Sequence, residues 1–242
     1  MNRLSKCIQF QLKSAMKSTA WFLAIYSAVC LFLFVFIAQL TRASNSGGSI
    51  NFGFYLAGAI FLFISVSAGY KPHFNFLLMF GNTRRNIFLS SVCTFSIISV
   101  VLSVVSLLVQ LLDEAATAAL SGSGSFNSDM ISAIYGNSAT AATEFIWFLG
   151  LFILIFSFGM LYGSLSYKFG KAFITCFWIA FGLSWMVLPA MAGAAAFINA
   201  LKAYFCYGVP NGILLAPVNF LITAIILCAG TYALSARQPQ VA

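Results

Sequence analysis

Acidic residues and histidine are scarce in this chain. It carries four Asp and Glu residues and one His among 242 residues, against 12 Lys and Arg residues. Charged residues make up 7% and hydrophobic residues 62%, which leaves too little polar side-chain surface to cover a water-soluble globule of this length. The composition therefore excludes a soluble enzyme or soluble binding domain, and it predicts an integral membrane protein.

Patterns that carry catalysis or bind metals are also missing. The only histidine, His73, follows Lys71 and Pro72, and the six cysteines form no C-x-x-C pair. No G-x-S-x-G, H-E-x-x-H or Walker A pattern occurs. We therefore expect no enzymatic activity, no metal and no cofactor in this chain. Because no Asp, Glu or His lies deep within an apolar run, a carrier coupled to protons or sodium ions is also disfavoured.

Long uncharged runs predict an all-α fold with six transmembrane helices. A helical span needs about 20 apolar residues to cross a hydrocarbon core of roughly 30 Å, so each run can be interpreted as one span. The expected spans are 21–40, 52–70, 87–112, 145–165, 172–192 and 212–234, which together make one transmembrane domain over 21–242.

The basic residues indicate the orientation of these spans. If the N-terminus is cytoplasmic, ten Lys and Arg residues lie inside and only Arg42 and Lys202 lie outside. This bias follows the positive-inside rule, and it explains the net charge of +8 without a nucleic-acid partner. We therefore expect an N-in, C-in topology in a bacterial cytoplasmic membrane, with lipids as neighbours.

Three connecting segments carry further predictions. Residues 1–20 combine apolar residues at steps of four with cations elsewhere, which is typical of an amphipathic helix in the cytoplasmic interface or of a plain basic tail. The outer loop 113–143 is rich in Ser, Gly and Ala, which predicts a flexible loop with short helical pieces at its ends. Helix breakers flank the apolar segment 193–211, which predicts either an outer re-entrant hairpin or an ordinary external hairpin.

Several small or polar residues repeat at helical spacing inside the spans. Gly159 and Gly163 form a G-x-x-x-G pattern that favours close helix packing, and Asn219 and Thr223 are expected to bond between helices. A polar face on the third span would either pack against another helix or line a path for an amphipathic substrate. Its residues are Ser96, Ser99, Ser103, Ser106 and Gln110.

The connection 71–86, KPHFNFLLMFGNTRRN, is too apolar for a solvated loop. It predicts a short helix under the membrane that ends at a glycine and is followed by an arginine pair. Those arginines would anchor the span to anionic lipid or dock onto a partner. The candidate coupling residues are Phe74, Phe76, Leu78, Phe80, Gly81, Arg84 and Arg85.

Together, the basic N-terminal helix, the six spans, the segment ending G-x-[ST]-[RK]-[RK] at 81–85 and the interrupted outer hairpin resemble the permease subunit of ATP-binding cassette transporters of the type-2 exporter class. The resemblance implies that 71–86 is a coupling helix docked into a separately encoded ATPase. It also implies a dimer of permeases, formed with a second copy or a paralogue, that exports an amphipathic peptide, lipid or drug-like molecule. The alternative is a membrane-embedded binding or immunity protein that works without ATP.

Overall fold

The computed structural model describes residues 3–44, 53–121, 135, 140–187, 194–207, 209 and 212–236, and within these ranges every regular element is a helix. The all-α prediction is therefore confirmed for the described part of the chain. The helices are α1 (Arg3–Ser44), α2 (Phe54–Met79), α3 (Arg84–Ser121), α5 (Ala141–Val187), α6 (Ala194–Tyr204) and α7 (Gly212–Ala236).

Five of these helices, α1, α2, α3, α5 and α7, are long and apolar enough to cross a membrane. This is compatible with a multi-pass membrane protein. The expected six spans are not resolved one by one, because 145–165 and most of 172–192 lie within α5. That helix is interrupted at Gly170, whose φ of 68° and ψ of −152° are readily adopted only by glycine. The count of six spans therefore stays a prediction.

The N-terminal segment is joined to the first expected span in one helix of 42 residues. No Gly or Pro occurs between Arg3 and Ser44, so nothing in the backbone interrupts α1 near residue 20. Along its first turns, Cys7, Gln11 and Thr19 are buried against the bundle, whereas the lysines are exposed. The amphipathic face is thus used at least partly for helix packing, and the interfacial placement of 1–20 stays a prediction.

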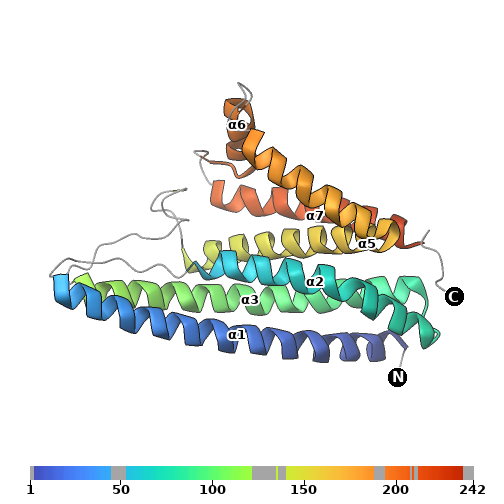
Figure 1. Ribbon diagram of the computed structural model, residues 1–242, viewed down its shortest axis with the longest axis horizontal. Coiled ribbons are helices and arrows are strands. Elements are labelled where there is room, and N and C mark those ends of the chain that lie inside the picture. The colour runs from blue at the N-terminus through green and yellow to red at the C-terminus, as the bar shows by residue number, and fades with distance from the viewer. Residues whose placement is uncertain are drawn as a thin grey trace.

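The long helices lie side by side, and α1 begins at the same end of the bundle at which α7 ends (Figure 1). We call this the N/C end; the α2–α3 turn lies there too. Gly159 and Gly163 allow α5 to approach α2 closely: a Cβ atom at Gly163 would lie 2.7 Å from Tyr70 Cβ, and one at Gly159 would lie 3.2 Å from Val66 Cβ. The predicted packing role of both glycines is confirmed.

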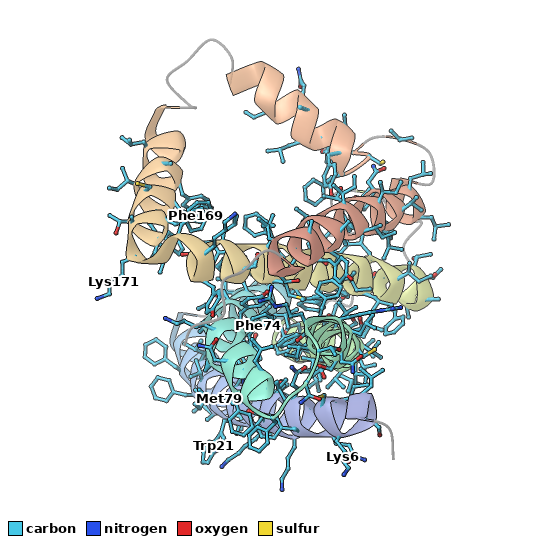
Figure 2. All side chains as sticks on the ribbon, turned by 90° about the vertical axis from the view of Figure 1, so that its right-hand side faces the viewer. Lys6, Trp21, Phe74, Met79, Phe169 and Lys171 are labelled. Atoms are coloured by element: carbon cyan, nitrogen blue, oxygen red, sulfur yellow. The ribbon has the colours of Figure 1, made fainter. Side chains whose placement is uncertain are left out.

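The segment expected as an outer hairpin contains α6, which is tied to α7 by polar side chains. Asn219 Nδ2 donates to the Tyr204 carbonyl oxygen at 2.9 Å, and the Tyr204 hydroxyl bonds Thr223 Oγ1 at 3.0 Å. These contacts confirm the predicted bonds between helices. Figure 2 shows α6 and the limb of α5 beyond Lys171 standing apart from the main bundle. The re-entrant placement of 193–211 stays a prediction.

The segment 113–143, expected as an outer loop with short helical pieces at its ends, is helical at both ends. Helix α3 continues through Ser121 and α5 already begins at Ala141. Between them, the structure describes only Tyr135 and Thr140, so the rest of that segment lies outside the described residues.

Candidate functional site

The segment expected as a separate coupling helix begins as the final turns of α2. The helix runs through Pro72 to Met79, although proline removes one backbone hydrogen bond. Phe74 and Leu77 are buried together with Cys7 and Ile87 in a small core at the N/C end. This packing explains why the helix continues where the local sequence suggested a break.

The Gly-Asn-Thr part of the motif ends one helix and begins the next. Gly81 has a φ of 70°, and its N–H donates to the Leu78 carbonyl oxygen at 2.9 Å, as at a helix C-terminus with a left-handed residue. Thr83 then caps α3, since its Oγ1 accepts from the Asn86 N–H at 3.4 Å. These three residues therefore have a structural role in any tight turn between two helices.

The structure divides the predicted coupling residues into an inward and an outward group. Phe74 is 3% exposed, and Leu78 is half-buried against the same small core. By contrast, Phe76 is 42% exposed and Phe80 is 68% exposed. In Figure 2, which looks at the N/C end, Phe74 lies among the helices and Met79 lies at the projecting end of α2.

Met79 belongs to the exposed group, although it was not among the predicted coupling residues. Its side chain is 84% exposed, more than any other large hydrophobic side chain among the described residues. The missed signal was helical spacing: 76, 79 and 80 stand at i, i+3 and i+4 and share one face, whereas Phe74, Leu77 and Leu78 share another. We call Phe76, Met79, Phe80 and Arg85 the α2–α3 tip.

Aromatic contacts hold part of the tip in place. The Phe76 ring stacks on Phe10 of α1 with centroids 4.9 Å apart, and it meets the Phe80 ring at 4.7 Å. Because Phe10 also lies 6.2 Å from the His73 ring, α1 supports the last turns of α2 from the side. The Phe76 and Phe80 rings of the tip are thus held in place by contacts with neighbouring rings, and the tip is a supported apolar surface in this sense.

The two arginines occupy different environments. Both stand in the first turn of α3, where the helix dipole disfavours cations. Arg84 Nη1 donates to the Ser235 carbonyl oxygen at 3.4 Å, near the end of α7, where free carbonyl groups favour a cation. Arg85 is exposed and makes no hydrogen bond or ion pair within the described residues. Only Arg85 therefore has its whole side chain free to bind an external partner.

The serine face of α3 is turned into the protein. Ser99 and Ser103 are fully buried and Ser106 is 3% exposed, while Ser96 and Gln110 are half-buried. The three buried hydroxyls donate to carbonyl oxygens of their own helix at 2.7 to 2.9 Å. This arrangement supports the packing interpretation, and a substrate path along the face stays a prediction.

Within the described residues, no three His, Cys, Asp or Glu side chains gather into a possible metal site. Comparisons with protein-family models, with curated proteins and with solved structures found no match. A function for this chain must therefore be inferred from its own residues and from the geometry of the α2–α3 tip.

Proposed function

We propose that this chain is the membrane-spanning permease subunit of an ATP-driven exporter of the ATP-binding cassette type, with ATP hydrolysis in a separate partner subunit. The observation that carries the proposal is the α2–α3 tip, a supported apolar surface beside a free arginine at the N/C end of the bundle. The resemblance of the 71–86 segment to a coupling helix supplies the identity of the partner.

The chemistry of the tip suits a protein groove. Three large apolar side chains at the end of a helix bury apolar area when they enter a pocket, and such clusters commonly supply most of the binding energy of an interface. Arg85 is exposed in the first turn of the following helix, and its planar guanidinium can form paired hydrogen bonds with a carboxylate. A groove lined by apolar residues and rimmed by acids is the complementary surface expected on the ATPase.

The competing assignment of the same surface is lipid. Phenylalanine and arginine at the end of a membrane helix also suit the headgroup region, which would fit the alternative of a binding or immunity protein that works without ATP. The two assignments differ in what the exposed rings touch. Under the first they enter a protein pocket, and under the second they remain in the membrane interface.

Co-purification from the native cell separates these assignments. Under docking, the parent chain should bring an ATP-binding cassette ATPase with it, and Met79→Ala and Phe80→Ala should each weaken that association by about tenfold, since loss of a hot-spot side chain costs about 1.4 kcal/mol or more. Leu56→Ala is the matched control, because Leu56 is 60% exposed near the opposite end of α2. Equal recovery of the ATPase with all three variants, or no ATPase with the parent, would overturn the proposal.

A further inference from the structure

A cavity of about 170 Å³ lies between α1, α2 and α3 near the N/C end, and Met160 of α5 also contributes to its lining. It shares none of its lining residues with the α2–α3 tip. A cavity of this size accepts a benzene-sized group or a short stretch of acyl chain. It is therefore large enough to hold part of an amphipathic molecule.

The lining combines polar and apolar side chains along its whole length. Toward the N/C end, polar groups come from Gln11, His73 and Ser91, one on each of α1, α2 and α3, beside the apolar Phe74, Ile87 and Phe88. Toward the middle of the bundle, Leu62, Ile98 and Met160 line the cavity together with Ser65 and Thr19. The lining therefore fits a molecule whose polar head meets Gln11, His73 and Ser91 and whose apolar tail packs on Leu62, Ile98 and Met160.

Several polar groups in the lining have hydrogen-bonding capacity left. Gln11 is 4% exposed, and its side-chain amide pairs with Ser91 Oγ at 3.3 Å, which leaves at least one N–H of the amide without a partner within the described residues. In the same part of the chain, the Ser65 hydroxyl and the His73 imidazole also make no hydrogen bond. These groups line the cavity, so a bound molecule with acceptor oxygens can accept hydrogen bonds from the Gln11 amide and the Ser65 hydroxyl.

The charges around the cavity restrict the head of the bound molecule. No Asp or Glu is among the lining residues, and Lys13 and Lys17 are exposed on α1 next to the lining residues Ser14 and Ser18. Since Ser14 and Ser18 are themselves exposed, the cavity is open along the α1 edge. If a bound acyl chain is longer than the cavity, the rest of it can extend through this opening into the surrounding lipid.

We infer that this cavity binds a single-chain amphipath whose head is a carboxylate or an uncharged acceptor group and whose tail is an acyl chain. The Gln11 amide and the His73 ring donate to the head, and the first carbons of the tail pack on Leu62, Ile98 and Met160. The site is formed by one chain, so binding requires neither ATP nor a partner ATPase.

Photolabelling of the full-length chain in phosphatidylcholine vesicles tests this site. The probe is a palmitic acid analogue with a diazirine on its chain, and labelled peptides are located by mass spectrometry. We expect label on the cavity residues and at least tenfold less of it in Ser65→Phe, whose ring fills the cavity. Ile64→Phe is the matched control. It adds the same ring at the neighbouring position, where the native Ile64 side chain is 56% exposed. Its labelling should equal that of the parent.

Competition on the parent chain tests the head group without any substitution. Laurate should displace the probe at least tenfold more effectively than dodecylamine, since a hydrogen bond to a charged acceptor contributes about 1.5 kcal/mol or more. Label spread over the lipid-facing residues of all helices would overturn the site, and equal competition by laurate and dodecylamine would overturn the assignment of its head group. Because both experiments use the chain alone, their failure leaves the docking proposal untouched.

Discussion

Gly163→Ala should destabilise the bundle although alanine is the better helix former. The added methyl group would lie 2.7 Å from Tyr70 Cβ and 3.3 Å from the Ser67 carbonyl oxygen. Neither atom is the end of a flexible side chain, so α2 and α5 would have to separate. Overpacking of this kind costs about 1 to 3 kcal/mol, against a gain of about 1 kcal/mol in helix propensity. The net loss in free energy of unfolding is therefore between about 0 and 2 kcal/mol.

Gly182→Ala isolates the packing contribution. It lies in the same helix, and a Cβ atom there would have no neighbour within 4 Å, so only the gain in helix propensity remains. The free energy of unfolding of each variant can be measured by titrating the protein from mild micelles into sodium dodecyl sulfate. We expect Gly163→Ala to be less stable than Gly182→Ala by about 1 to 3 kcal/mol. Equal free energies for the two variants would refute the close contact between α2 and α5.

Four further experiments test individual contacts and the membrane topology. Arg85→Lys should weaken ATPase association because lysine lacks the planar fork, while Arg84→Lys should not; equal effects on co-purification would contradict the division of the pair. Asn219→Ala removes the hydrogen bonds to the Tyr204 carbonyl oxygen and Cys206 Sγ, so maleimide should label Cys206 faster. An unchanged labelling rate would show that contacts other than these two hydrogen bonds hold the turn. The topology can be tested with an impermeant maleimide applied to intact cells that express a chain without native cysteines. The reagent should label Tyr207→Cys and not Lys171→Cys, and the reverse result would invert the topology. The native Cys7 would be a poor reporter on either side, because it is only 3% exposed. Ser103→Leu adds bulk at a fully buried position and should lower the free energy of unfolding by about 1 to 3 kcal/mol in the same detergent titration, whereas an unchanged value would indicate that this face contacts lipid.

Much of the fold could be predicted from sequence because helices depend on local interactions. Uncharged runs of sufficient length satisfy their own backbone hydrogen bonds, and they predicted the all-helical fold, although the described part of the structure contains five helices of sufficient length where six spans were expected. Gly81 was correctly expected to end a helix, since only the local backbone decides that role. The glycine pair at 159 and 163 was also informative, because close approach between membrane helices requires small residues.

The tertiary structure decided which side of each apolar helix faces a neighbour. Phe74 and Phe76 are two residues apart and chemically identical, yet one is buried by Cys7 and Ile87 and the other stacks on Phe10 at the surface. Arg84 and Arg85 are adjacent, yet only Arg84 reaches the end of α7. An almost uniformly apolar helix carries no alternation from which such faces could be inferred, and the contacts that create them join residues far apart in the chain. The cavity beside Gln11 has the same origin, since residues of four helices must meet to form it.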